Sequence, residues 1–294
     1  MDLVAAVNWR FKRHAGGEGR PPFYDIDATY PSLRILDRAH PVISAEMEAV
    51  LHGKDRIPRY HDLDRAESYI SGSDDPDKNW RVFMLWSMAG TPKANQARCP
   101  RSTALLRRIP NLYQAFFSIL DAGKSIPAHS GSYLGYLRYH LGLHVPATNP
   151  PTMRVKDQYH TWEAGRSILF DDSWNHEVVN RSDDIRVVFI VDVLRPLPFH
   201  LHAANWILTR LLMRRSEEAR QVMANTSRST PEAEVTATAP RIRGRRRRSP
   251  SDQNRSGSVK RVQRPPFTTA RKDESAPWCL SAAKLTSGPL KMSW

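Results

Sequence analysis

The chain has 294 residues and carries 44 Lys and Arg against 30 Asp and Glu, a formal net charge of +14. This length allows one domain of about 200 residues with extensions, or a pair of small domains. Cys99 and Cys279 lie far apart, which excludes a disulfide scaffold and a cysteine-based zinc site and fits a reducing compartment. No apolar run approaches the roughly 20 residues that cross a bilayer. We therefore expect a cytoplasmic protein that could also contact a membrane surface peripherally.

The positive charge is concentrated towards the C-terminus. Residues 214–294 contain 18 Lys and Arg against 7 Asp and Glu, whereas residues 1–213 contain 26 against 23. From residue 221 the sequence is rich in Ser, Thr, Pro and Arg without apolar periodicity, so 221–294 is predicted to be a disordered basic tail. Its RGRRRR run is typical of a solubilising or weakly anion-seeking segment, with a nuclear or nucleic-acid patch as the alternative. No specific nucleic-acid binding is expected.

The N-terminal part of the chain predicts a helical lead-in followed by a strand. Residues 1–21 are interpreted as an extension that ends in a flexible joint, GGEGRPP, before the body begins. The stretch 43–53 has helical spacing, with Ser44 as a candidate cap and an apolar face made of Ile43, Met47, Val50 and Leu51. WRVFMLW at 80–86 has the composition of a strand.

Between residues 113 and 194, short strands follow one another without an intervening helix. The predicted strands are YQAFFSIL, YLGYLRYHLGLHV, PTMRV, QYHTW, RSILF, HEVVN and IRVVFIVDVL, separated by turn-forming pieces such as DAGKSIP, PATNPP and DDSWN. This succession predicts a mainly β protein with an antiparallel sandwich or barrel, not a βαβ sheet.

After Pro196 the sequence predicts one amphipathic C-terminal helix within 198–220. Its apolar stripe consists of Leu201, Ala204, Ile207, Leu208, Leu211 and Leu212, and it is flanked by Arg210, Arg214 and Arg215. The simplest interpretation is that the stripe packs on the barrel. Because Trp and Arg border the apolar face, an interfacial membrane helix is the alternative. In that case residues 198–215 and the basic tail would make weak contact with an anionic membrane or another polyanion.

Polar residues alternate along the strand YLGYLRYHLGLHV. One face carries Arg138, His140, Gly142 and His144, and the other carries Tyr139, Leu141, Leu143 and Val145. In an open sheet the polar face would contact solvent. In a closed barrel the same face would line the interior and direct an Arg and a His at a ligand.

Further candidate residues flank the neighbouring predicted strands. His129 lies in PAHSG, His176 follows DDSWN, and Arg186 begins a strongly apolar strand. A guanidinium among buried residues needs an anionic partner. Two imidazoles with inward arginines are what an iron site with a dicarboxylate cosubstrate requires. Asp171 and Asp172 either initiate a turn or orient His176.

Three stretches carry a family resemblance over residues 22–197, namely FYDIDATYPSL, HSGSYLGYLRYHLGLHVP and TWEAGRSILFDDSWNHEVVNRSDDIRVVFIVDVLRP. They resemble the aspartyl/asparaginyl β-hydroxylase family of Fe(II)/2-oxoglutarate-dependent oxygenases, which includes lipid A 2-hydroxylase-like members. The resemblance implies a double-stranded β-helix, a jelly-roll or cupin-like barrel, with Fe(II), 2-oxoglutarate and O2. It implies that His129 and His176 bind iron and that Arg186 binds the C5 carboxylate of 2-oxoglutarate. The further cosubstrate-binding residues that it implies are Ser118, Arg138 and His140.

The broader superfamily usually has the pattern His-x-Asp/Glu, but here Gly131 stands two residues after His129. The aspartyl/asparaginyl branch that this chain resembles also lacks a carboxylate at that position. The first functional hypothesis is hydroxylation of the β-carbon of an aspartyl/asparaginyl-type residue in a peptide or protein, which Gly131 favours. The alternatives are 2-hydroxylation of a fatty-acyl chain in a lipid, which the basic helix would suit, and an inactive barrel that serves as a binding module. Cys99 is expected to be structural, and the histidines not expected to contact the iron are His144, His160, His200 and His202.

Overall fold

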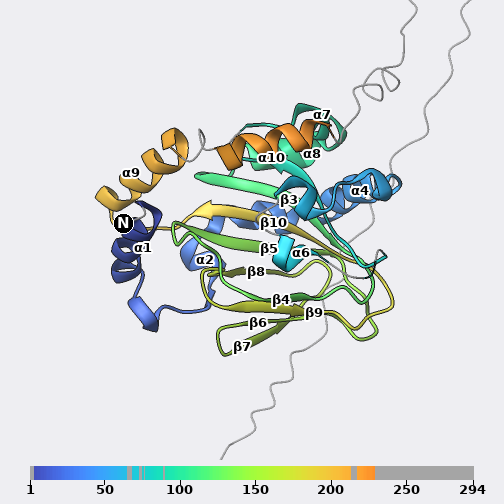
Figure 1. The fold of residues 1–294 in the computed structure, drawn as a ribbon, viewed down its shortest axis with the longest axis horizontal. Coiled ribbons are helices and arrows are strands. Elements are labelled where there is room, and N and C mark those ends of the chain that lie inside the picture. The colour runs from blue at the N-terminus through green and yellow to red at the C-terminus, as the bar shows by residue number, and fades with distance from the viewer. Residues whose placement is uncertain are drawn as a thin grey trace, which may run out of the picture. The chain divides into compact units, whose positions relative to one another are not determined.

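The computed structural model describes residues 3–64, 68–72, 75, 77–88, 90–212 and 217–228 (Figure 1). One antiparallel sheet has the strand order β1 (Phe23–Tyr24), β8 (Ser167–Phe170), β5 (Tyr136–His144), β10 (Arg186–Leu194), β3 (Leu112–Leu120), β2 (Trp80–Trp86). The other has the order β4 (Ile126–His129), β9 (His176–Val179), β6 (Thr152–Val155), β7 (Gln158–Thr161). From β3 to β10 the chain passes back and forth between the sheets. This is the topology of the predicted double-stranded β-helix.

The strands of the larger sheet are apolar on both faces, which explains their near-continuous hydrophobic sequences. On β10, Val188 and Ile190 pack into the barrel interior, together with residues of the smaller sheet. Phe189 and Val191 point the opposite way and pack against helices. Because both faces are covered, every residue of β10 is buried. A polar side chain on the inward face of this sheet is therefore enclosed by the barrel.

Helices cover the outer face of the larger sheet. The helices before β3 are α1 (Leu3–His14), α2 (Ile26–Thr29), α3 (Arg34–Arg38), α4 (His40–Leu51), α5 (Tyr60–Leu63), α6 (Ser68–Ser71), α7 (Lys93–Arg98) and α8 (Pro100–Leu106), with 3₁₀ turns η1 (Gly17–Gly19), η2 (Pro31–Leu33) and η3 (Lys54–Arg56). On α4 the predicted apolar spacing holds, because Ile43, Met47 and Val50 are all buried. The predicted start is wrong: α4 begins at His40, with Pro41 in its first turn, so Ser44 lies inside the helix.

The sequence does not predict strand β4, because Ile126 and Pro127 fall in the turn-forming piece DAGKSIP. Ile126 is buried, and His129 pairs directly with His176 of β9. A four-residue strand that contains Pro127 has no clear alternation. Tertiary pairing with β9 therefore decides its conformation.

The N-terminal segment is part of the body, which corrects the expectation of a separate extension over residues 1–21. Phe11 on α1 is 2% exposed, and the Asn8 side chain hydrogen-bonds the backbone of both Ser132 and Leu134. The expected flexible joint is also ordered, since Arg20 is 4% exposed. Phe11 and Asn8 hold α1 against the loop that follows β4, and Arg20 holds the segment after α1 against the loop between β8 and β9.

The C-terminal helix predicted after Pro196 is α9 (Phe199–Ile207), which continues as a π-helical turn, η5 (Leu208–Leu212). Leu201 and Leu208 are buried, as expected, but Ile207 and Leu211 are 50% and 47% exposed. The inward position between the two buried leucines is taken by Asn205, which is fully buried and hydrogen-bonded to the loop after β4. Only part of the predicted apolar stripe therefore packs on the body.

A second C-terminal helix, α10 (Glu217–Arg228), corrects the predicted start of the disordered tail at residue 221. Asn225 donates to the carbonyl oxygens of Asp62 and Leu63 on α5, at 3.0 and 3.2 Å, and Val222 packs against the barrel cluster. These contacts fix a helix whose short apolar pattern was overlooked. Residues 229–294, which include the RGRRRR run, lie outside the described residues. None of the described helices is both long and apolar enough to span a bilayer.

Candidate active site

Two histidines from different strands meet at one end of the smaller sheet. His129 ends β4, His176 begins β9, and their ring centroids lie 4.1 Å apart. Nδ1 of His129 is 2.9 Å from the carbonyl oxygen of Pro127. Nδ1 of His176 is likewise 2.9 Å from the carbonyl oxygen of Trp174. Because a carbonyl can only accept, each Nδ1 donates, which leaves both Nε2 lone pairs available to a metal.

Both imidazoles are neutral at physiological pH. Burial, reinforced by the neighbouring His176 ring, lowers the pKa of His129 to about 4. Burial also lowers the pKa of His176 to about 4. The neutral ring is the form that binds a metal ion, and paired imidazole donors suit Fe(II) among other transition metals. Within the described residues, however, no group of three or more His, Cys, Asp or Glu side chains is arranged to hold a metal.

The carboxylate of Asp172 lies where a side chain at position 131 would project. A Cβ atom added to Gly131 would be 2.8 Å from Oδ1 of Asp172, and the Gly131 amide donates to the Asp172 carbonyl at 2.8 Å. Oδ1 is buried without a hydrogen-bond partner, and burial raises the pKa of Asp172. An orphaned carboxylate oxygen is costly unless a ligand satisfies it. Together with the two free Nε2 atoms, this observation fits a bound, hydrated cation.

Arg186 lies in the barrel interior, and none of the described residues provides it with an anionic partner. The side chain begins β10, is 1% exposed, and leaves Nε and Nη1 without hydrogen bonds. Its Cζ atom lies 4.6 Å from the ring centroid of Trp162, and burial lowers its pKa to about 9. A fork of buried donors facing an aromatic ring is arranged to receive a carboxylate.

His140 and Phe170 connect the region of Arg186 with the histidine pair. The His140 ring centroid is 5.9 Å from that of Trp162 and 4.9 Å from that of Phe170. Phe170 in turn lies 6.1 Å from His176. Neither nitrogen of His140 has a hydrogen-bond partner in the part of the chain that the structure describes, and burial together with Arg138 and Arg186 holds its pKa well below the usual value. The interior therefore runs continuously from the histidine pair to Arg186.

Ser118 shares this interior. It is 1% exposed, pairs with Val188 of β10, and accepts a hydrogen bond from Nε1 of Trp80 at 2.9 Å. Arg186 is two residues from Val188 and therefore lies on the same face of the sheet. The structure thus brings together the predicted residues Ser118, His140 and Arg186.

Arg138 also points inwards, but two carboxylates already bind its guanidinium. Nε and Nη2 pair with both oxygens of Asp192 at 2.9 and 2.8 Å, and Nη1 is 3.0 Å from Oδ2 of Asp172. Oδ2 of Asp172 also accepts from the Tyr136 hydroxyl at 2.8 Å. The role that this geometry gives Arg138 is to hold Asp172 beside the histidine pair. Its predicted contact with a cosubstrate stays a prediction.

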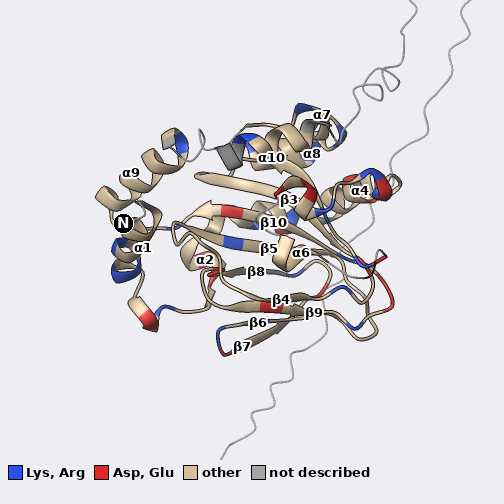
Figure 2. Cartoon of the chain, in the orientation of Figure 1, with Lys and Arg blue, Asp and Glu red and all other residues tan. Residues whose placement is uncertain are grey.

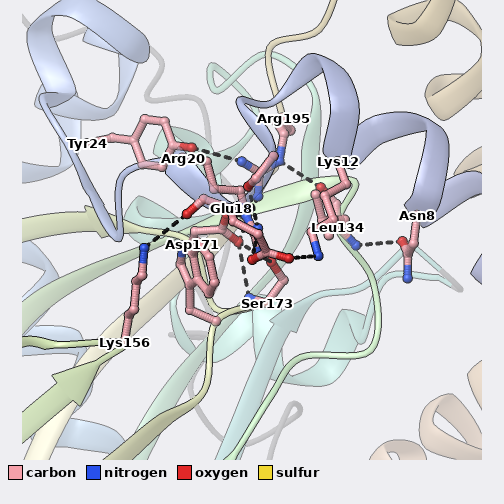
Figure 3. Close-up of polar contacts among 12 residues, drawn as sticks. Asn8, Lys12, Glu18, Arg20, Tyr24, Leu134, Lys156, Asp171, Ser173 and Arg195 are labelled. Carbon is pink, nitrogen blue, oxygen red and sulfur yellow. Dashed lines mark hydrogen bonds and ion pairs between the residues drawn. The ribbon is translucent and has the colours of Figure 1, made fainter.

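Asp171 anchors the loop that leads to His176, in a cluster that sequence reasoning did not foresee (Figure 3). Arg20 and Arg195 each donate to its carboxylate at 2.8 Å. The backbone and the hydroxyl of Ser173 donate to Oδ1 as well, so Asp171 initiates the turn, as one of the two hypotheses predicted. The partners could not be found from sequence, because Arg20 is 151 residues away.

Of the residues not expected to bind iron, His160 lies beside the barrel interior, with its ring centroid 5.9 Å from that of Trp162, and His200 of α9 lies 6.1 Å from His14 of α1. His144 is at the far end of β5, where Nε2 is 2.8 Å from Asp184, and it does not face the interior as the alternation had suggested. A bulge in the pairing of β5 with β10 interrupts the alternation just before it. Cys99 is fully buried in the core under the helices, and burial raises its thiol pKa to about 12.

Comparison with known proteins gives the family of this chain. The family model described as "Aspartyl/Asparaginyl beta-hydroxylase" matches residues 37–196. The "ornithine lipid ester-linked acyl 2-hydroxylase" of Rhizobium tropici is 38% identical over 194 residues, which cover 66% of this chain and 67% of that protein. The human "aspartyl/asparaginyl beta-hydroxylase" is 33% identical over 126 residues, 40% of this chain and 16% of that protein.

Solved structures similar to this chain include a cupin family protein with a double-stranded β-helix fold from Methanocaldococcus jannaschii. It has a TM-score of 0.26 and 16% identity, over 43% of this chain and 90% of that one. The family assignment comes from the sequence matches alone. The family model covers more than half of the chain. The chain therefore belongs to the aspartyl/asparaginyl β-hydroxylase family and is a hydroxylase.

Proposed function

We propose that the protein is an Fe(II)- and 2-oxoglutarate-dependent dioxygenase that hydroxylates an unactivated C–H bond. The observation that carries the proposal is a buried Arg186 with unpartnered donors, joined by His140 and Phe170 to a pair of neutral histidines with free Nε2 atoms. His129 and His176 would hold the iron. Arg186 would bind the distal carboxylate of 2-oxoglutarate. The negative charge of that carboxylate would then balance the positive charge of the guanidinium.

The chemistry that bound iron supplies is oxidation of 2-oxoglutarate by O2 to succinate and CO2, with insertion of the second oxygen atom into the substrate C–H bond. The protein residues contribute binding, orientation and exclusion of water. Arg186 orients the cosubstrate by a planar, two-donor contact that a lysine could not reproduce. Trp162 and Phe170 line the path between Arg186 and the histidines with apolar surface. Asp172, held by Arg138 and Tyr136, presents Oδ1 beside Gly131 as an acceptor for a bound water.

For the substrate we propose a fatty-acyl chain of a lipid, hydroxylated at C2. Support comes from the Rhizobium tropici relative, whose name specifies this reaction and whose match extends over 66% of this chain. The second candidate is the β-carbon of an aspartyl or asparaginyl residue in a peptide. Gly131 favours it, because the family branch that modifies peptides also lacks a carboxylate at this position, and the human relative is 33% identical over its shorter match.

The experiment is a single-turnover reaction of the full chain. Fe(II) and 2-oxoglutarate are added without oxygen, and O2 is then admitted in the presence of an ester-linked acyl lipid in detergent micelles or of an aspartate-containing peptide. We expect succinate to form with O2 and the lipid to gain the mass of one oxygen atom at C2. If only the peptide gains oxygen, the lipid substrate is wrong and the aspartyl or asparaginyl β-carbon is supported instead. Binding of 2-oxoglutarate without any succinate would contradict both and support an inactive binding module.

A further inference from the structure

Large exposed hydrophobic side chains are concentrated on one pair of helices. Among the described residues, eight such side chains are exposed, and five of them lie on α1, α9 and η5. These five are Trp9, Phe199, Trp206, Ile207 and Leu211, and we call Phe199, Trp206, Ile207 and Leu211 the α9 face. Phe199 is 88% exposed and Trp206 45%. Single exposed hydrophobics are ordinary, but a contiguous group of them marks an interaction site.

The orientation of the α9 face is fixed by the opposite side of the helix. There Leu201 and Leu208 are buried, and the Asn205 amide both accepts from the Tyr133 hydroxyl at 2.5 Å and donates to the Gly135 carbonyl at 2.6 Å. Turning the helix to bury the α9 face would break these hydrogen bonds and expose the two leucines. The apolar residues of the α9 face therefore remain directed outwards.

The surroundings of the α9 face are cationic. Helix α1 carries Arg10, Lys12 and Arg13, of which Lys12 pairs with Glu18 of η1, and η5 carries Arg210; among the described residues, α1, α9 and η5 contain no Asp or Glu. The two helices are neighbours, because the rings of His14 and His200 lie 6.1 Å apart and both helices contribute to one apolar cluster. Figure 2 shows basic residues on α1 and at the end of the helix that continues from α9 into η5, and an acidic residue in η1, the short turn after α1. Exposed Trp, Phe and Leu beside Arg and Lys suit the boundary between headgroups and acyl chains of an anionic bilayer.

The same helices hold the segment that follows the first candidate iron ligand. Asn8 of α1 binds the backbone of Ser132 and Leu134, and Asn205 of α9 binds Tyr133 and Gly135. This segment starts directly after His129. A bilayer in contact with the α9 face would therefore be separated from the loop that follows β4 by the width of the α9 helix.

We propose that the α9 face, with the cations of α1 and η5, docks the enzyme on an anionic phospholipid bilayer that supplies its acyl substrate. This inference rests on the proposed lipid hydroxylation for its purpose, but binding itself can be measured without turnover. Large apolar side chains that leave water on docking stabilise the bound state. Replacement of Phe199 and Trp206 by serine should therefore weaken binding by at least tenfold.

The test is sedimentation of the full-length chain with vesicles of phosphatidylcholine containing phosphatidylglycerol, and with vesicles of phosphatidylcholine alone, at physiological salt. We expect binding to the anionic vesicles, and at least tenfold weaker binding for the double variant Phe199→Ser/Trp206→Ser. The matched control is Tyr159→Ser, which removes a side chain that is 76% exposed on β7 and should leave binding unchanged. The basic C-terminal region is identical in all three proteins, so the difference reports on the α9 face.

Thermal melting checks that each variant is folded, and Phe199→Ser alone gives a second test because that side chain has almost no contacts to lose. Wild-type binding by both Phe199 variants would overturn docking through the α9 face, whether or not the lipid is hydroxylated. Loss of binding by the variants supports docking even if no lipid is hydroxylated, in which case the proposed function alone fails. If the α9 face docks the enzyme and the lipid is its substrate, the double variant should lose activity on vesicles but retain it on detergent-dispersed lipid.

Discussion

Asp171 and Asp172 are consecutive and buried, but Asp171 lies in a fully hydrogen-bonded cluster and Asp172 in an incompletely hydrogen-bonded one. Asp171 is surrounded by Arg20, Arg195 and Ser173, so both of its oxygens have partners. Asp172 has one oxygen without a hydrogen-bond partner in the described parts of the chain. In the same barrel, two guanidinium nitrogens of Arg186 and both ring nitrogens of His140 also have none. The charges of the Asp171 cluster are fully paired, whereas Asp172, His140 and Arg186 keep buried polar atoms that have no hydrogen-bond partner among the described residues. Incomplete hydrogen bonding thus distinguishes the active site from the structural ion pairs beside it.

The largest effect should come from removing a candidate iron ligand. His176→Ala takes away one of two imidazoles, so we expect metal-dependent succinate formation to fall by at least about 100-fold, more than the roughly 10–100-fold typical of changes around a metal's ligands. The melting temperature should remain near that of wild type. His144→Ala, at the far end of β5, is the control and should retain full turnover. Near-normal turnover in His176→Ala would contradict the iron assignment.

Breaking the paired region should cost stability instead of cosubstrate affinity. Asp171→Asn leaves two buried guanidinium groups without a full counter-charge, and we expect the free energy of unfolding to fall by about 3–5 kcal/mol. Urea unfolding measures this loss. Asp27→Asn, which removes a carboxylate from an exposed pair with Arg34, should change stability little. Equal losses in the two variants would show that the Asp171 cluster is not the anchor that its geometry suggests.

Replacing Arg186 should have the opposite effect, because it should lower the affinity for 2-oxoglutarate without lowering stability. Arg186→Met removes a buried, unpaired guanidinium, so the protein without cosubstrate should melt no lower than wild type, while its affinity for 2-oxoglutarate falls by about 10–100-fold. Calorimetric titration under anaerobic conditions gives the affinity. Arg186→Lys should recover only part of it, because an ammonium lacks the planar fork. Wild-type affinity in the Met variant would exclude Arg186 as the carboxylate-binding residue.

The smallest effect concerns pH. Burial and the charges of Arg138 and Arg186 hold the pKa of His140 below its unfolded value, so the unfolded chain takes up this proton first as pH falls. The contribution of His140 to stability is therefore present above pH 6.5 and is lost progressively on acidification. In urea unfolding between pH 7 and pH 5, His140→Gln should show a shallower decline than wild type. His144→Gln should retain the wild-type slope; a shallower slope there as well would point to a general surface effect.

The local sequence was sufficient for most of the barrel. The strands predicted between 113 and 194 correspond to seven observed ones, because their alternating or continuous apolar residues require a buried sheet whatever its neighbours. The inward direction of Arg138 and His140 follows from the same alternation. What alternation could not supply was the partner of each inward residue: Arg138 is bound by two carboxylates, whereas Arg186 has none.

Elements with weak local patterns depended on tertiary contacts. Strand β4 exists because β9 pairs with it, and α10 is held by hydrogen bonds to α5, 162 residues earlier in the chain. The family motifs identified His129, His176 and Arg186 as candidates from sequence. Only the folded chain placed Asp172 in the space left by Gly131, and only it turned Asn205 inwards so that Phe199 and Trp206 face outwards. Periodicity acts over a few residues, whereas burial and hydrogen-bond partners are set by segments that meet only after folding.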